Sequence, residues 1–158
     1  MKNVAFTNCD ICWWAGGIVA NDVYGTIDNV LVTLDNAPYG SGVYDNFGAL
    51  CSSSKIGATI SNCVTWSIAR RDDSYSDMHS SFIRYEDGAT LSNNYTVYGG
   101  EGNTSVNYGI GRAHNGKKYA TTEIVVMTES EVATTTFSGL NSEIWNVTAG
   151  QLPTFKKA

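Results

Sequence analysis

Four asparagine-centred segments recur along the chain, and this repeat constrains the fold more than any other feature of the sequence. The asparagines stand at positions 3, 29, 62 and 93, so successive copies are 26, 33 and 31 residues apart. The later copies also agree before the asparagine, over residues 25–29, 58–62 and 89–93. Repeats of about 20–50 residues are typical of solenoids and arrays, in which each repeat buries its apolar side on its neighbours.

A second apolar segment precedes each of the last three copies. These segments are residues 16–20, 47–51 and 80–84, and the turns that follow contain Gly25, Gly57 and Gly88. Short apolar segments separated by glycine turns, without helical periodicity, indicate strands. The predicted unit is therefore two short strands joined by a turn, followed by a connection of variable length.

Stacking of equivalent strands predicts rows of equivalent side chains inside the fold. One expected interior row is Ile27, Ile60 and Leu91, and another is Val4, Val30, Cys63 and Asn94. The four repeat asparagines are expected in one turn, where stacked side-chain amides hydrogen-bond to one another. The alternative is four unrelated surface turns, since asparagine is common in turns.

The last third of the chain predicts closing strands and a cap. Residues 99–118 are expected to be loops around a short strand near Val106, and 123–127 a strand. Thr128–Glu131 matches a capping box, so a short helix is expected to follow and to end near Gly139. Residues 143–147 are expected to form a last strand. We expect this segment to cover the open edge of the last coil, which otherwise invites aggregation.

The repeats resemble the GLUG-motif β-solenoid repeats of bacterial surface and secreted proteins, which also alternate a Gly-Gly-apolar strand with a turn and an Ile-x-Asn strand. The resemblance covers roughly residues 1–100, and the copies here are degenerate. It implies right-handed parallel β-helix coils, found in extracellular adhesins and more loosely in phage tail appendages. It carries no catalytic residues over to this chain. The run from Trp145 to Pro153 resembles the usual ending of such domains.

The sequence thus predicts an all-β fold, a right-handed parallel β-helix (solenoid) of about four coils with a small C-terminal cap containing a short helix. Residues 1–100 are expected to form the solenoid repeat region, and residues 101–158 the closing strands and cap. Because the start of the chain shows no such cap, we expect a C-terminal portion of a longer solenoid, or an end covered by a partner chain.

Charge and hydropathy exclude several partners. The net charge of -5 leaves no basic field for nucleic acid, and no apolar run approaches the ~18 residues of a membrane span. The first residues lack the basic start and apolar stretch of a secretory signal. The expected location is nonetheless extracellular, on a bacterial cell surface or a virion, by the resemblance.

Candidate chemistry is sparse. Cys9-x-x-Cys12 is one close pair, with Cys51 and Cys63 far downstream. This spacing favours buried free thiols over a zinc site. Two disulfides in an oxidising compartment are a further alternative, which the spacing does not select. Carboxylates that could act as acid and base in glycoside cleavage, or bind calcium, are Asp72, Asp73, Asp77 and Glu86. A salt-laced connection is the favoured interpretation of that segment. His79 and His114 have no recognisable nucleophile beside them. No metal or cofactor is expected.

Aromatic residues are the better indication of function. The candidate ligand-binding residues are Trp13, Trp14, Tyr39, Tyr44 and Tyr75. Exposed aromatic rings stack on sugars, although packing of these rings beneath the connections is an equal alternative. The leading hypothesis is a non-enzymatic attachment or receptor-binding module for a glycan or protein. The alternatives are a polysaccharide-degrading enzyme and the structural tip or cap of an oligomeric fibre, so a homo-oligomer is among the expected states.

Overall fold

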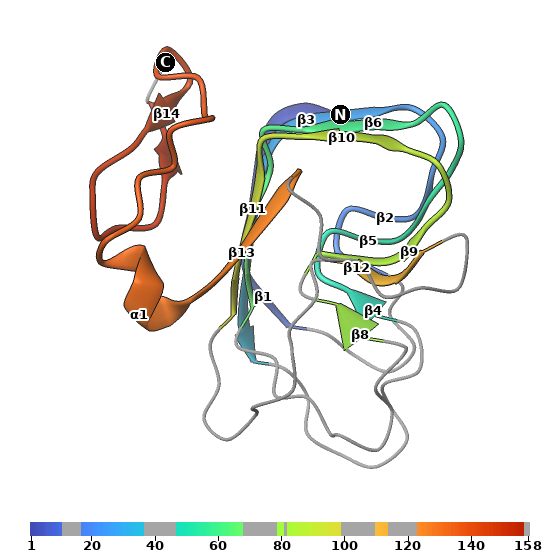
Figure 1. Cartoon of the computed structure of the whole chain (residues 1–158), viewed down its shortest axis with the longest axis horizontal. Coiled ribbons are helices and arrows are strands. Elements are labelled where there is room, and N and C mark those ends of the chain that lie inside the picture. Colours follow the sequence, from blue (N-terminus) through green and yellow to red (C-terminus); the bar gives the residue numbers. More distant parts are fainter. Residues whose placement is uncertain are drawn as a thin grey trace.

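Parallel β-strands make up most of what the structure describes. The computed structural model describes residues 1–10, 17–36, 47–67, 79–80, 82–98, 110–113 and 123–156 (Figure 1). The strands are β1 (Lys2–Asp10), β2 (Ala20–Val23), β3 (Thr26–Asn36), β4 (Phe47–Gly48), β5 (Cys51–Ser54), β6 (Thr59–Ser61), β7 (Val64–Ser67), β8 (His79–Ser80), β9 (Ile83–Glu86), β10 (Thr90–Ser92), β11 (Asn94–Tyr98), β12 (Ile110–Ala113), β13 (Ile124–Thr128), β14 (Trp145–Asn146) and β15 (Thr154–Phe155). One helix is described, α1 (Glu129–Val132). The expected all-β class is therefore confirmed.

The strands form two main parallel sheets. The larger sheet has the order β10-β6-β3-β7-β11-β13, with β1 also paired to β3. The smaller sheet has the order β12-β9-β5-β2, and β4 pairs with β8. All of these pairings are parallel, whereas β14 and β15 pair antiparallel. In Figure 1 the strands of each repeat lie over those of the next, as the pairings require.

The repeat asparagines bend the larger sheet. Residues before Asn29 in β3 pair with β6, and residues after it pair with β7. Asn62 separates β6 from β7 in the same way, and Asn93 separates β10 from β11. The φ angles of Asn3, Asn29, Asn62 and Asn93 are 55°, 53°, 54° and 53°. Asparagine tolerates this left-handed conformation better than most residues with a β-carbon, because its short polar side chain hydrogen-bonds locally.

Strand register makes the four asparagines equivalent. The residues just before them pair in sequence, as Lys2 with Asp28, Asp28 with Ser61, and Ser61 with Ser92. The expectation of one recurring turn is confirmed, and the alternative of four unrelated turns is wrong.

The expected interior rows are also present. Ile27 pairs with Ile60, and Ile60 with Leu91; the first two are buried in the main core cluster, and Leu91 packs against it. In the second row, the fully buried Asn94 accepts a hydrogen bond at 3.1 Å from the Cys63 amide and donates one at 2.9 Å to the Ile60 carbonyl. These bonds satisfy a polar side chain inside the core, so its burial is affordable.

The C-terminal segment does not lie where the sequence indicated. Leu31, Val64 and Tyr95 pair in register and form a second core cluster with residues of the segment 129–156. The segment therefore packs on the outer face of the larger sheet, beside β11 and β13 in Figure 1, instead of covering the end strand. The reason is that this row leaves an apolar face on the outside, which must be buried.

Two contacts fix this segment to the sheet. The Trp145 indole is almost fully buried and donates from Nε1 to Asn29 Oδ1 at 3.0 Å. The Tyr95 hydroxyl accepts a hydrogen bond from the Gly139 amide at 2.9 Å, and a β-carbon at Gly139 would lie 3.0 Å from that hydroxyl. The segment thus reaches from the fourth strand repeat back to the bend at Asn29.

The predicted capping box is confirmed, but α1 is shorter than expected. The Thr128 amide donates to the Glu131 carboxylate at 2.7 Å, as the motif requires. The helix ends at Val132 and does not reach Gly139. The Thr134 and Thr135 hydroxyls both donate to the Glu131 carbonyl, and such back-bonding competes with continuation of the helix.

Two further differences concern strands. The sequence did not indicate β12, which adds to β9 within a region expected to be loops; Val106 lies outside the described residues. It also missed β15, which pairs with β14. Both β12 and β13 extend the parallel sheets beyond residue 100. The division of the chain near residue 100 stays a prediction.

Substitution of Asn93 tests the left-handed bend. Asn93 is exposed, and its side chain donates one hydrogen bond, at 3.3 Å, to Asn62 Oδ1. Alanine and glycine variants both lack this bond, so the difference between them reports on the backbone conformation. We expect Asn93→Ala to lower the free energy of unfolding by about 1–2 kcal/mol, because a β-carbon without a polar group disfavours this conformation. Asn93→Gly serves as the matched control and unfolds at a higher denaturant concentration than Asn93→Ala. An alanine variant as stable as the glycine variant would contradict the assigned backbone geometry.

Candidate functional site

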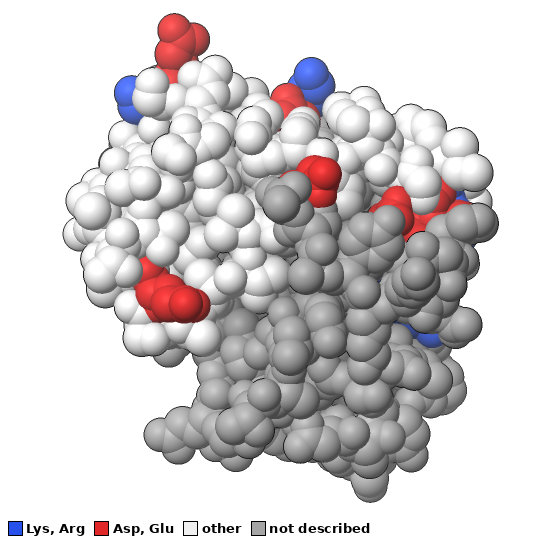
Figure 2. All heavy atoms as spheres, in the orientation of Figure 1, with Lys and Arg blue, Asp and Glu red and all other residues white. Residues whose placement is uncertain are grey.

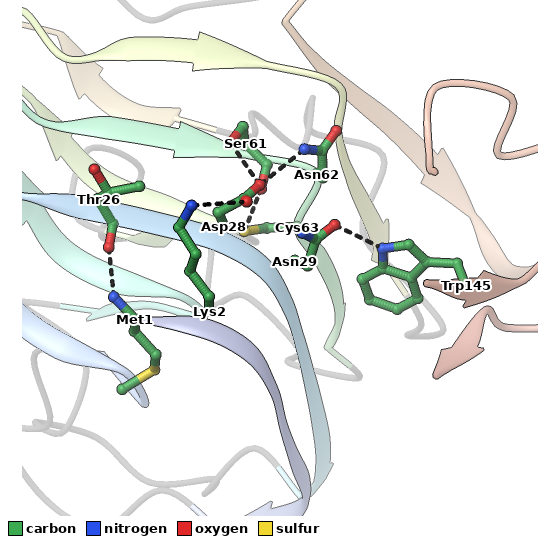
Figure 3. A network of polar contacts seen from close by, with 9 residues as sticks. All are labelled: Met1, Lys2, Thr26, Asp28, Asn29, Ser61, Asn62, Cys63 and Trp145. Carbon is green, nitrogen blue, oxygen red and sulfur yellow. Dashed lines mark hydrogen bonds and ion pairs between the residues drawn. The ribbon is translucent and has the colours of Figure 1, made fainter. Parts of the chain in front are cut away.

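Asp28 is the centre of a polar network at the asparagine bends (Figure 3). Its Oδ1 accepts hydrogen bonds from Ser61 Oγ and from Asn62 Nδ2, each at 2.8 Å. Lys2 Nζ lies 3.7 Å from the other carboxylate oxygen. Three strand repeats therefore meet at one carboxylate. With its acceptor sites shared among these donors, Asp28 acts as a connection between repeats.

The asparagine side chains form a partial ladder. Asn93 Nδ2 donates to Asn62 Oδ1 at 3.3 Å, which is the amide-to-amide contact that the repeat predicted. Asn62 in turn donates to Asp28, and Asn29 accepts from Trp145. The expectation that all four amides bond to one another is wrong. The Asp28 carboxylate takes the hydrogen bond from Asn62, and the buried Trp145 indole donates to Asn29.

A column of threonines lies beside this network. Thr26, Thr59 and Thr90 pair in register on β3, β6 and β10. Thr26 and Thr90 are exposed and Thr59 is half-buried. Their hydroxyls make no hydrogen bond within the described part of the chain. Neighbouring strands lie about 4.8 Å apart, so the column presents three hydroxyls at regular spacing on the surface.

Tyr24 lies one turn before this column. It is 71% exposed, and it is flanked by Val23 and Gly25, whose carbonyls accept hydrogen bonds from the next repeat. Ile56, at 76% exposure, occupies the corresponding turn of that repeat. The combination is an exposed aromatic ring and an exposed apolar side chain beside a polar strip. We refer to Tyr24, Ile56, Thr26, Thr59 and Thr90 as the threonine face.

All five residues that the sequence indicated for ligand binding lie outside the described residues. These are Trp13, Trp14, Tyr39, Tyr44 and Tyr75. They stay predictions. Tyr24 was indistinguishable in sequence from the other tyrosines near turns, since only its exposure in the fold separates it from the buried Tyr95.

The candidate acidic residues give no acid–base pair that can be described. Asp72, Asp73 and Asp77 lie outside the described residues. Glu86 is buried at the end of β9, where its Oε1 accepts a hydrogen bond from the Ala89 amide at 2.7 Å. This bond closes the turn that contains Gly88, whose φ is 81°. Glu86 thus has a local structural role.

The cysteines in the described residues are free thiols. Cys51 and Cys63 are buried, and Cys9 is half-buried; Cys12 lies outside the described residues. Burial raises the pKa of Cys51 and of Cys63 to about 12. Within the described ranges, no group of three His, Cys, Asp or Glu side chains is placed to hold a metal ion.

The surface drawn in Figure 2 carries scattered acidic and basic side chains over its described part, without a patch of one sign. No described helix is long and apolar enough to cross a membrane. Comparisons with protein-family models, with curated proteins and with solved structures found no match for this chain.

Thiol labelling tests the buried cysteines. A pKa of about 12 leaves roughly one thiolate in ten thousand thiols at pH 8, and the thiolate is the reactive form. We expect iodoacetamide to leave Cys51 and Cys63 unmodified in the folded protein at pH 8, as read by peptide mass spectrometry. Both react after unfolding in guanidinium, which is the control. Labelling of either residue at its unfolded rate in the folded protein would contradict its burial.

Proposed function

We propose that the chain forms a right-handed parallel β-helix of about four coils, with the C-terminal segment as a lateral cap. The parallel order of both main sheets and the recurring bend at asparagine support this proposal. Right-handed connection is the strong preference for parallel strands in one sheet. Such a fold places equivalent residues of successive coils in straight columns along its axis.

The function we propose is non-enzymatic: an attachment or receptor-binding module on a bacterial surface or a phage tail, with glycan as the leading ligand class and a protein receptor as the alternative. The single observation that carries it is the threonine face, a regular strip of unpaired hydroxyls with exposed Tyr24 beside it. The extracellular location follows the resemblance of the repeats to surface proteins.

The chemistry of the threonine face suits sugars. Each threonine hydroxyl can donate one hydrogen bond and accept others, which matches the hydroxyls of a glycan. An exposed tyrosine ring stacks on the apolar face of a sugar ring. The charged side chains near these residues form pairs of opposite sign, Lys55 with Asp22 and Lys2 with Asp28. Neutral or weakly charged glycans are therefore favoured over phosphate-rich ligands.

Cleavage of polysaccharides has less support. It needs two carboxyl groups about 5–9.5 Å apart across a groove. Glu86 is buried in a turn, and its candidate partners are not described. The structural role in a fibre has a specific observation in its favour: in the described part of the chain, no strand pairs with the outer edges of β1 and β13.

A glycan array with the intact protein tests this proposal. We expect binding of a restricted glycan class, weakened about tenfold or more by Tyr24→Ala and by Thr59→Val, because each removes a ligand contact. Thr148→Val is the matched control, since Thr148 is exposed but lies in the C-terminal segment, and it leaves binding unchanged.

Two outcomes would overturn the glycan proposal. One is an array with no bound glycan. The other is a bound glycan whose affinity is the same for the wild type and for both threonine-face variants. A parallel assay for new reducing ends, with any glycan that binds, addresses cleavage; we expect none to be released.

A further inference from the structure

The two outer edges of the larger sheet have complementary geometry. Along one part of this sheet the order of strands is β1, β3, β7, β11 and β13. Among the described residues, no strand pairs with the outer edge of β1 or with that of β13. A parallel strand has two different edges, and an unpaired edge can template a further strand. Within the sheet, each strand pairs through one edge with the strand before it and through the other edge with the strand after it. The free edge of β1 is of the first type and the free edge of β13 is of the second type, so the two edges match.

We propose that this surface binds a second copy of the chain head to tail, with β1 of one molecule added in parallel to β13 of the next. This association goes beyond ligand binding and does not depend on the proposed glycan site.

The register of the molecule extends across this junction without a shift. Val4 occupies the same row as Val30, and Asn94 the same row as Ile124. Phe6 shares its row with Val32, Thr65, Thr96 and Val126. In the proposed junction Val4 lies on Ile124 and Phe6 on Val126. Val4, Phe6 and Val126 are each half-buried, so the second copy completes the burial of interior side chains.

The asparagine ladder extends in the same way. Glu123 precedes Ile124 as Asn93 precedes Asn94, so Glu123 holds the fifth position of the ladder. Within the molecule, two ladder side chains donate to the repeat before them: Asn62 donates to Asp28, and Asn93 donates to Asn62. By analogy with Asn62 and Asn93, Asn3 of the second copy donates to the Glu123 carboxylate, which can accept several hydrogen bonds at once.

Charge favours this direction of association. Lys2 is 66% exposed at the β1 edge, and Glu123 is exposed at the β13 edge. Opposite charges at the two edges attract in a head-to-tail junction, whereas like edges brought together would place like charges side by side. An association of unlike edges does not close on itself and produces a filament.

Hydrogen bonds between the backbones of neighbouring repeats show which amides face the free edges. The Tyr95 amide donates to Cys63 in the preceding repeat, and the Asn94 amide donates to Glu123 in the following one. Ala5 shares the row of Tyr95, so its amide faces away from β3. Val126 follows the alternation of Asn94, so its amide faces away from β11. Proline at either position removes an edge donor without removing a donor to the neighbouring strand of the same molecule.

Sedimentation analysis of the intact protein tests the junction. We expect the mean mass of the wild type to rise with concentration beyond that of a dimer. Ala5→Pro and Val126→Pro each sediment as monomers. Mixed in equal amounts, the two variants form dimers and nothing larger, because each retains one intact edge. Ala5→Val, which keeps the amide, associates like the wild type.

Several results would overturn the proposal. These are a wild type that stays monomeric at every concentration, association that neither proline changes, or proline variants that each dimerise alone. Circular dichroism checks that each variant folds. If a proline variant does not fold, charge reversal replaces it: Lys2→Glu and Glu123→Lys each weaken association, and the double variant restores it. Failure of that rescue also counts against the junction, and the threonine-face experiment is unaffected by either outcome.

Discussion

Left-handed bends at asparagine hold the successive strand repeats in register. At Asn29, Asn62 and Asn93 the chain turns between two strand segments with nearly the same φ angle. A bend repeated with one geometry keeps the segments on either side in register with those of the neighbouring repeats. Without it, the interior rows and the outer apolar row could not both be continuous.

Polar groups near the bends are satisfied mainly between repeats. Asp28 accepts hydrogen bonds from Ser61 and Asn62 of the next repeat, and Asn94 donates one to the Ile60 carbonyl of the repeat before it. Such bonds add little net free energy, but a buried group left unpaired costs about 1–3 kcal/mol. They therefore act mainly by penalising a shift in register, because a slip by one residue would leave these groups without partners.

The sequence was informative where a local chemical preference repeats and less so where contacts span the chain. The equivalence of the asparagines, the row of Ile27, Ile60 and Leu91, and the capping box at Thr128 could all be predicted. The position of the C-terminal segment could not, since it depends on contacts such as Trp145 with Asn29, 116 residues apart. One signal was available: residues 30–32 are apolar on both faces, which indicates a strand covered on both sides.

The candidate site shows the same division. Its threonines recur at one position of the repeat and were visible as part of the aligned segments, but their exposure follows only from the fold. The aromatic residues favoured from sequence lie in the connections, outside the described residues, whereas Tyr24 lies in a tight turn. For these threonines the sequence therefore predicts the position in the repeat, whereas their exposure at the surface follows from the fold.

Nuclear magnetic resonance of the isotopically labelled protein provides a direct test of the parallel stacking of the asparagine-bent repeats. Val64 is the decisive residue, because it pairs with both Leu31 and Tyr95. Parallel stacking predicts nuclear Overhauser contacts from Val64 to both neighbours, in the pattern of parallel strands. Contacts to only one neighbour, or close contacts between α-protons as in antiparallel strands, would contradict it.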